Sequence, residues 1–379
     1  MNFRIIAYIV GWVCNCQAAF MMLPLLTAGI YREKDFSAFL LAMLVCLVVG
    51  VPLTRKKPKN KVFYIKDGCV AVALSWLALC IFGAIPFVVS GCIPHPIDAL
   101  FETVSGFTTT GSSILSDVEV LPHCILIWRS FTHWIGGMGV LVFLLSLLPL
   151  AGGYHMNLMK AESPGPSVSK LVPKVQSTAK ILYTIYFGMT LIQLALLLIG
   201  RVPLFDSLCI TFGTAGTGGF GIVNDSLGSY STYCQVVTTI FMILFGVNFS
   251  AYYLVLTKKF RQAFKYEEVR YYFGIIAVAI VIIALNTAHL FRNLLTAFQQ
   301  AAFQVGSIIT TTGFSSTDFN QWPALSKTVL VLLMFVGACA GSTGGGIKVS
   351  RILILCKAAK KEFQLYLHPN AVKKIKMDD

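Results

Sequence analysis

The sequence predicts an all-α polytopic membrane protein, in which two leading helices precede three units of a span, a half-helix and a second span. Of its 379 residues, 56% are hydrophobic and only 12% are charged, and the mean hydropathy is +0.76. A soluble domain of this size needs a charged exterior around its core. Apolar stretches of about twenty residues recur instead, and that length crosses roughly 30 Å of hydrocarbon. The polar tetrapeptide TTTG interrupts the apolar sequence twice, at 108–111 and 310–313.

The first two helices are predicted over residues 5–29 and 36–53, joined by the charged turn YREKD. The first stretch is too long for a signal-peptide core and lacks a convincing cleavage site, so it is interpreted as a span. Most of the 30 lysines and arginines fall in TRKKPKNK, the loop 160–180, KKFRQAFK and the segment from Lys348. A cytoplasmic N-terminus places these regions inside, as the positive-inside rule expects. The net charge of +14 therefore indicates topology, and we expect no nucleic-acid partner.

Three units follow the leading helices, and their central parts align without gaps. Counting back thirteen positions from Gly111, Gly219 and Gly313 gives Asp98, Asp206 and Gln300. The central element is too short to cross a membrane, so each is predicted as a half-helix of about ten residues followed by extended polar backbone. The flanking spans are predicted at 67–89 and 125–150, at 180–200 and 234–256, and at 272–289 and from 326 onward.

The polar backbone after each half-helix predicts an ion pore. Non-helical backbone at membrane depth is tolerated only where protein buries it or it lines an aqueous cavity. Threonine–glycine backbone can line up carbonyl oxygens, and several such loops around one axis replace the water shell of a potassium-sized cation. The candidate filter residues are Thr108, Thr109, Thr110, Gly111, Gly216, Thr217, Gly218, Gly219, Thr310, Thr311, Thr312 and Gly313.

Acidic residues near the half-helices have two interpretations each. Asp98 and Asp206 either cap or charge the start of a short helix, or attract cations at the outer mouth. Glu102 is either a carboxylate on the ion path or a partner for a donor such as Arg129, and the partner role is favoured.

The cysteines do not predict a metal site. Most of the eleven lie inside predicted spans, and the pair Cys14-x-Cys16 lacks a second half, so they are interpreted as small buried hydrophobes. A disulfide among Cys92, Cys124 and Cys234 stays open.

The last apolar segment is interrupted by GACAGSTGGGIK, residues 337–348. Small residues in membrane helices usually indicate close packing, and this is our interpretation of GGMG from Gly136. The density of small residues after 337 exceeds what packing needs, so a broken helix with a mobile gate loop is predicted. Lys348 alternatively marks the cytoplasmic boundary. The gate-loop candidates are Gly337, Ala338, Gly341, Ser342, Thr343, Gly344, Gly345 and Gly346.

Together these strings resemble the TrkH/KtrB group of the Trk/Ktr/HKT superfamily of potassium transporters, and the TrkH branch in particular. The resemblance covers essentially the whole chain, through DALFETVSGFTTTGSS, WRSFTHWIGGMGVLV, KAESPGP, TAGTGGFG, TTTGFSSTDFNQWP, GSTGGGIK and HPNAV. It implies four linked repeats around a pseudo-fourfold pore in a bacterial inner membrane, with K⁺ as the transported ion and no organic cofactor in this chain. It also implies a gate loop in the third inner helix, a homodimer and a TrkA-like RCK nucleotide-binding regulatory subunit.

Two departures from the family pattern shape the expectations. The second filter reads Ala-Gly-Thr-Gly-Gly, and the chain ends at VKKIKMDD before a fourth repeat. We therefore expect either a fragment of a longer protein or a truncated product that does not conduct. The alternatives to a potassium-translocating subunit are an ion-coupled secondary transporter of another solute and a non-conducting truncated paralogue. An enzyme is not expected, because no spacing suggests a nucleophile with its base.

The predicted organisation has five parts. They are the two leading helices at 1–60, the first pore repeat at 61–178, the second at 179–265, the third with its interrupted inner helix at 266–360, and a cytoplasmic loop toward an absent fourth repeat at 361–379.

Overall fold

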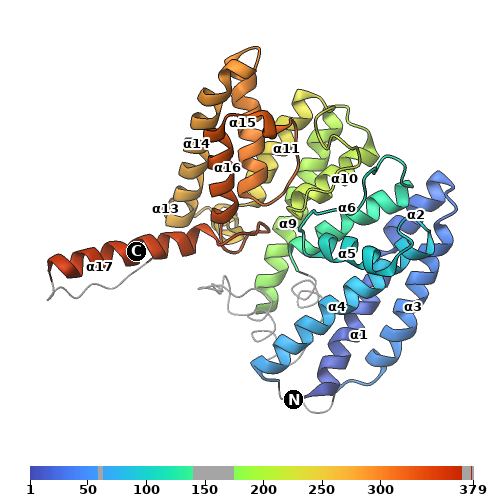
Figure 1. Cartoon of the computed structure of the whole chain (residues 1–379). Helices are drawn as coiled ribbons and strands as arrows, with labels where there is room; N and C mark the ends of the chain where they lie inside the picture. The colour runs from blue at the N-terminus through green and yellow to red at the C-terminus, as the bar shows by residue number, and fades with distance from the viewer. Residues whose placement is uncertain (59–62, 140–174, 369–376, 378–379) are drawn as a thin grey trace. The chain divides into compact units, whose positions relative to one another are not determined.

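The chain folds into helices throughout the residues whose structure is described. The computed structural model describes residues 1–58, 63–139, 175–368 and 377 (Figure 1). Every regular element within them is a helix, as the sequence predicts. Five of these helices are long and apolar enough to cross a membrane, and a sixth span is possible if one bent pair is counted as a single crossing. The chain divides into two compact units, Met1–Ser226 and Leu227–Asp379.

The first unit begins with helices that confirm the two leading spans and the span predicted at 67–89. These are α1 (Phe3–Phe20), α2 (Met22–Tyr31), α3 (Phe36–Arg55) and α4 (Ile65–Val89). Helix α1 packs against α3 and α4, and Figure 1 shows the three side by side in blue. Polar side chains tie α1 to both neighbours, because Gln17 donates to the Leu79 carbonyl at 2.8 Å and Asn15 donates to Thr54 at 3.2 Å. Such interhelical hydrogen bonds hold membrane helices together where water is absent.

Two short helices in this unit are the predicted half-helices. Helices α5 (Pro96–Phe107) and α10 (Leu204–Ala215) have 12 residues each, so each spans about 18 Å and cannot cross the roughly 30 Å core. Helix α5 packs between α4 and α6 (His123–Gly137), and α10 packs between α6 and α9 (Val175–Ile199). The prediction of one helix over 125–150 was wrong in part, because α6 ends at Gly137 and Gly139 has a φ of +79°. Residues 140–150 lie outside the described residues.

A carboxylate from the α2–α3 loop closes the start of α6. The first turn of α6 has no side-chain cap of its own. Glu33 accepts from the backbone N–H groups of His123 at 2.6 Å and Cys124 at 3.0 Å instead. Burial alone raises the pKa of Glu33, but these hydrogen bonds hold it below its ordinary value. The ionised form is therefore favoured beside the positive end of the helix, which fixes α6 to the leading helices.

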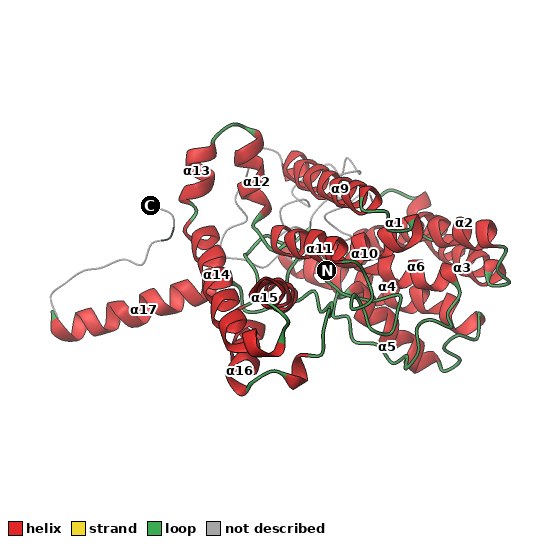
Figure 2. Ribbon diagram, turned by 90° about the horizontal axis from the view of Figure 1, so that it is seen from above, coloured by secondary structure: helices red, strands yellow, loops and turns green. Residues whose placement is uncertain are grey.

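In the second unit, a predicted continuous span is bent. Helices α11 (Thr232–Phe245) and α12 (Phe249–Leu256) meet at 94°, so the span predicted over 234–256 is not one continuous helix. At the break, a Cβ on Gly246 would clash with the Tyr272 hydroxyl, so the chain passes close to α14 there. Asn248 then starts α12 by accepting from the Ser250 N–H at 2.8 Å. Figure 2 shows α12 beside α13 (Phe260–Lys265) after this turn.

The third unit predicted from the sequence is built from α14 to α17. Helix α15 (Leu294–Ile309) packs against α11, α14 (Glu267–Thr287) and α16 (Ala324–Val336), and Figure 2 looks nearly along its axis. It has 16 residues and is therefore longer than the half-helix of about ten that was predicted. The predicted helix break is confirmed, because α16 ends at Val336 and α17 (Val349–Leu367) begins only after the glycine-rich loop. Figure 1 shows α17 leaving the α14–α16 bundle.

Candidate functional site

The three glycine-ended segments that follow α5, α10 and α15 share one unusual backbone; they are called filter strands 1, 2 and 3 below (residues 108–111, 216–219 and 310–313). The middle threonine of each is left-handed, with φ of 53° at Thr109, 54° at Thr217 and 59° at Thr311. A left-handed conformation costs a non-glycine residue roughly 1–2 kcal/mol. Three threonines adopting it at equivalent positions indicate that the surroundings enforce this path.

The same hydrogen bonds close each short helix onto its strand. The N–H of Thr110 donates to the Ser105 carbonyl at 2.9 Å. Gly218 donates to Gly213 at 3.0 Å, and Thr312 donates to Ser307 at 2.9 Å. A left-handed residue just past a helix end allows such bonds to satisfy the last carbonyl groups. The gap-free alignment made from the sequence therefore corresponds to one repeated local structure.

Backbone hand alternates along each strand. In strand 1, φ is −81° at Thr108, positive at Thr109 and +75° at Gly111, and Thr110 has no positive φ. Strands 2 and 3 follow the same pattern, ending with φ of 75° at Gly219 and 89° at Gly313. Alternating right- and left-handed residues turn successive amide groups toward one side and carbonyl groups toward the other. A row of carbonyl oxygens is suited to coordinating a dehydrated cation.

Pairs of threonine hydroxyl groups brace strands 1 and 3, and strand 2 lacks the residues for such a pair. The Oγ1 atoms of Thr108 and Thr110 lie 2.8 Å apart, and those of Thr310 and Thr312 lie 2.7 Å apart. Thr108 also donates to the Val104 carbonyl at 2.7 Å, which ties strand 1 back to its helix. The equivalent residues of strand 2 are Gly216 and Gly218, which carry no hydroxyl.

Helix α6 packs tightly against strands 1 and 2. A Cβ on Gly136 would clash with the Phe107 carbonyl, which directly precedes strand 1. A Cβ on Gly137 would lie 2.7 Å from the Gly216 Cα of strand 2. The close packing predicted for GGMG is therefore confirmed, and α6 serves as a wall that both strands share.

The Glu102–Arg129 pair predicted from the sequence is present and buried. Arg129 Nε lies 2.8 Å from Glu102 Oε1, and their side chains are 2% and 0% exposed. Glu102 also accepts from the Ser113 hydroxyl and the Ile114 N–H beyond strand 1. Arg129 donates to the Gly221 carbonyl at 3.3 Å and lies over the Phe220 ring, both beyond strand 2. One ion pair thus holds the segments that follow two strands.

In the third repeat, an uncharged side chain holds the segment that follows the strand. Gln304 lies nine positions before Gly313, as Glu102 lies nine positions before Gly111. Its amide donates to the Thr317 carbonyl at 3.2 Å and approaches the Ser315 hydroxyl at 3.5 Å. A neutral amide therefore organises the segment after strand 3.

The gate-loop residues lie directly against strand 3. The N–H of Gly345 donates to Thr311 Oγ1 at 2.7 Å, and a Cβ on Gly344 would lie 2.9 Å from the Thr310 carbonyl oxygen. The loop is folded back on itself, with Val349 N–H donating to the Ala338 carbonyl at 3.1 Å. The structure therefore brings the predicted gate and the predicted third filter strand together within one unit.

Glu268 joins the two ends of this loop to α14. Its Oε1 accepts from the Ala340 N–H at 2.7 Å and from the Ser350 N–H at 3.1 Å, and the residue is 4% exposed. Lys348 donates to the Gly344 carbonyl inside the loop. The broken helix thus has a defined path, while its mobility stays a prediction. Glu268 was not predicted; the signal available was a carboxylate at the start of an apolar span.

Two further sequence predictions have clear outcomes, and one buried residue was missed. Asp98 and Asp206 lie in the first turns of α5 and α10, but the N-cap residues are His95 and Pro203, so the capping interpretation was wrong while favourable charge at the helix start holds. All eleven cysteines are free thiols in the described part of the chain. His133, which was also not predicted, is fully buried beside strand 2.

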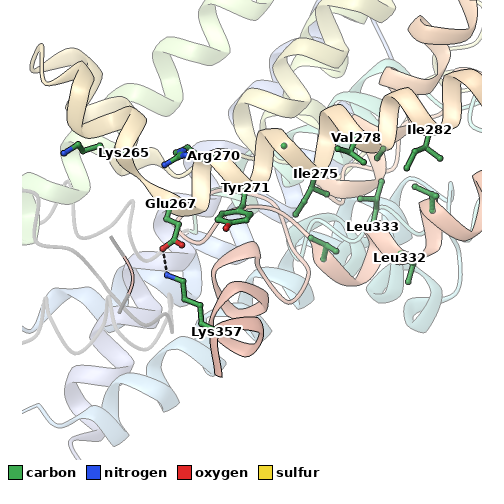
Figure 3. A pocket seen from close by; sticks show the side chains of 14 residues that line it. Lys265, Glu267, Arg270, Tyr271, Ile275, Val278, Ile282, Leu332, Leu333 and Lys357 are labelled. Carbon is green, nitrogen blue, oxygen red and sulfur yellow. Dashed lines mark hydrogen bonds and ion pairs between the residues drawn. The ribbon is translucent and has the colours of Figure 1, made fainter. Parts of the chain in front are cut away.

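A groove of about 930 Å³ runs along α14 and α16. Its walls include Ile275, Val278 and Leu332, and one end carries the ion pair of Glu267 with Lys357 (Figure 3). The described residues that line it include no filter or gate-loop residue. The groove is therefore separate from the candidate site.

A family model described as TrkH, cation transport protein, matches residues 35–379. The Trk system potassium uptake protein TrkH of Salmonella typhimurium is 36% identical over 387 residues, covering 100% of this chain and 80% of that protein. This chain belongs to the TrkH family. The TrkH protein of Escherichia coli (strain K12) is 35% identical over 384 residues with the same coverage. The crystal structure of the potassium transporter TrkH from Vibrio parahaemolyticus matches with a TM-score of 0.87 and 31% identity, over 100% of this chain and 79% of that one.

Membership of the TrkH family confirms the resemblance predicted from the motifs. The family consists of membrane transport proteins, so the expectation that the chain is not an enzyme is confirmed as well. The candidate strands and gate loop lie within the matched residues of this TrkH-family chain. Their roles in ion selection and gating stay predictions.

Proposed function

We propose that this TrkH-family chain is the potassium-translocating membrane subunit of a Trk-type uptake system, with the backbone carbonyl groups of strands 1, 2 and 3 selecting K⁺. The observation that carries the proposal is the shared backbone of three separate segments, each with a left-handed threonine two positions before a left-handed glycine. Selection of K⁺ over Na⁺ requires several carbonyl dipoles at defined positions, and a repeated backbone supplies them.

The loop of residues 337–346 is proposed as the gate. Its contacts with Thr310 and Thr311 place it next to strand 3, where a change in the loop path alters access to the strand. Gly337 has a φ of 71°, and a Cβ there would lie 2.5 Å from the Gly345 carbonyl oxygen. A larger residue at Gly337 therefore changes the path of the loop without directly contacting the proposed filter.

Membership of the family supports a proposal about partners and location. The relatives are named as Trk system potassium uptake proteins, which supports a multi-component system. We propose a TrkA-like RCK nucleotide-binding partner on the cytoplasmic side, a homodimer, and a multi-pass location in the bacterial inner membrane. A cytoplasmic N-terminus accounts for the basic segments at 54–61 and 258–265.

Growth rescue tests this function directly. The complete gene product, expressed with a TrkA-type partner in a bacterium that lacks potassium uptake, is expected to restore growth at low external potassium. Rubidium uptake that potassium competes for, and sodium does not, is the matching flux result. Membrane-inserted protein that gives neither rescue nor rubidium uptake contradicts the proposal. Competition of the flux by an organic solute favours the secondary-transporter alternative instead.

Gly313→Ser is expected to lower the potassium-over-sodium ratio. Nothing lies within 4 Å of the added Cβ, so the effect comes from the φ of 89°, which disfavours any residue but glycine. Because strain of roughly 1–2 kcal/mol favours displacement of the strand's carbonyl groups, selectivity is expected to fall by about tenfold. Competition of rubidium uptake by the two ions measures it. Gly91→Ser is the matched control, because Gly91 has a φ of 78° and equal room but lies before α5. Equal selectivity in both variants contradicts the filter assignment.

A further inference from the structure

The second filter strand differs from the others because another side chain occupies the space of its missing ones. A Cβ on Gly216 would clash with the backbone carbonyl of His133, and a Cβ on Gly218 would clash with the imidazole ring of His133. Gly218 has no positive φ, so backbone hand does not require glycine there. Steric exclusion by His133 of α6 thus explains why strand 2 has the sequence Gly-Thr-Gly where strands 1 and 3 have Thr-Thr-Thr.

The His133 ring has two neighbours in and after strand 2 and is 0% exposed. It stacks on Phe220, the residue that follows strand 2, with ring centroids 4.2 Å apart and planes inclined by 27°. It also lies against Gly218 of strand 2, where an added Cβ would clash with the ring. Among the described residues, neither ring nitrogen has a hydrogen-bond partner. The ring therefore acts on its surroundings through its shape and stacking.

We infer that His133 is the positioning residue of strand 2, replacing with one ring the brace that paired threonine hydroxyls supply in strands 1 and 3. The hydroxyl pairs link alternate residues of those strands, with the two Oγ1 atoms 2.8 Å apart in strand 1 and 2.7 Å apart in strand 3. In strand 2, the ring contacts Gly218 and stacks on Phe220, and it thereby restrains the backbone on both sides of Gly219. This inference rests on the proposed function, because it assigns His133 an effect on ion selection.

The relation between His133 and Gly218 predicts a specific coupling. His133→Ala leaves strand 2 without its brace, and Gly218→Ala forces the strand away from the ring. Each single change is expected to lower the potassium-over-sodium ratio by about tenfold, the scale on which cavities and overpacking act. The double variant His133→Ala/Gly218→Ala places a methyl group in the vacated space, so its ratio is expected to return to within about threefold of wild type.

His133→Phe separates shape from ring nitrogen chemistry. A phenyl ring keeps an aromatic group against Gly218 and Phe220. Because volume-conserving changes are usually tolerated, the variant is expected to keep the potassium-over-sodium ratio within about threefold of wild type. A loss equal to that of His133→Ala overturns the role of ring shape.

Phe131→Ala provides the matched cavity control on the same helix. The Phe131 ring packs against Phe20 and Phe212, with centroids 5.8 Å and 5.1 Å away, and both of these aromatic partners lie outside strand 2. It is expected to lower thermal stability in detergent while leaving the ion ratio at the wild-type value.

The experiment measures rubidium uptake into vesicles containing the complete transporter, with potassium or sodium as competitor, for all these variants and for Gly313→Ser. Recovery in the double variant supports the inference. Single variants at the wild-type ratio, or single losses that add without recovery, overturn it. If Gly313→Ser changes the ratio and the His133 variants do not, only the His133 inference fails. If Gly313→Ser has no effect either, the proposed filter fails.

Discussion

Arg129→Met is expected to destabilise the protein by about 3–5 kcal/mol, because it leaves the Glu102 carboxylate buried without its cation. The Glu102 side chain is 0% exposed, so water cannot replace the lost partner. The change also removes the donor to the Gly221 carbonyl and the cation over Phe220. Thermal unfolding in detergent, followed by the loss of the folded peak in size-exclusion chromatography, measures the effect.

A neutral replacement of both partners distinguishes a buried charge from lost packing. Glu102→Gln combined with Arg129→Met imitates the third repeat, where Gln304 performs the equivalent role without an ion pair. Since replacing a buried pair by neutral groups is often close to neutral, the double variant is expected to recover most of the stability. A double variant as unstable as Arg129→Met shows that packing, and not the stranded carboxylate, causes the loss. Unchanged stability in the single variant contradicts the importance of the pair.

Glu268→Ala is expected to raise potassium influx in the absence of the regulatory subunit. Glu268 accepts from Ala340 and Ser350, at the two ends of the proposed gate loop. Hydrogen bonds to a charged group contribute about 1.5–3 kcal/mol each, so losing them from the folded-back loop shifts its equilibrium by about tenfold or more. Rubidium uptake into vesicles without the partner measures the change. The expected result is a gain of activity, which misfolded protein cannot produce.

Glu267→Gln is the control beside it. This neighbouring carboxylate pairs with Lys357 at the surface, where their side chains are 24% and 31% exposed. Partly exposed ion pairs contribute little, so this variant is expected to show wild-type influx. Glu268→Gln keeps the accepting oxygen without its charge and is expected to fall between wild type and Glu268→Ala. Influx in Glu268→Ala at or below the wild-type level contradicts the role of Glu268 in holding the loop.

Local signals were enough to predict the half-helices. Pro96 opens α5, and the polar segment after Phe107 ends it, so the predicted stretch PIDALFETVSGF coincides with the helix. Counting from the glycines also placed Gly219 correctly among the left-handed glycines, although the letters around it differ from TTTG. The buried Glu102–Arg129 pair was predictable because an apolar surrounding leaves charges few alternatives to each other.

Other features depend on contacts that no local pattern carries. At the bend after α11, α14 brings Tyr272 against Gly246, and the Tyr272 hydroxyl donates to the Ile243 carbonyl at 3.0 Å. The two hydrogen bonds of Glu268 join residues 72 and 82 positions apart. The left-handed backbone of Thr109 and its two equivalents opposes the intrinsic preference of threonine. It could therefore not be predicted from residue type, and it becomes visible only in the geometry that recurs at the three helix ends.

The shared wall formed by α6 has a mechanical consequence. Because Gly136 contacts the start of strand 1 and Gly137 contacts strand 2, a tilt of this one helix moves the carbonyl groups of both strands at once. Packed interiors transmit such displacements because they contain little free volume. Two strands of the proposed ion pathway thus depend on one helix, whose N-terminal end Glu33 fastens to the leading helices. A displacement of the leading helices is therefore expected to move α6 and to change the positions of the carbonyl groups in strands 1 and 2 together.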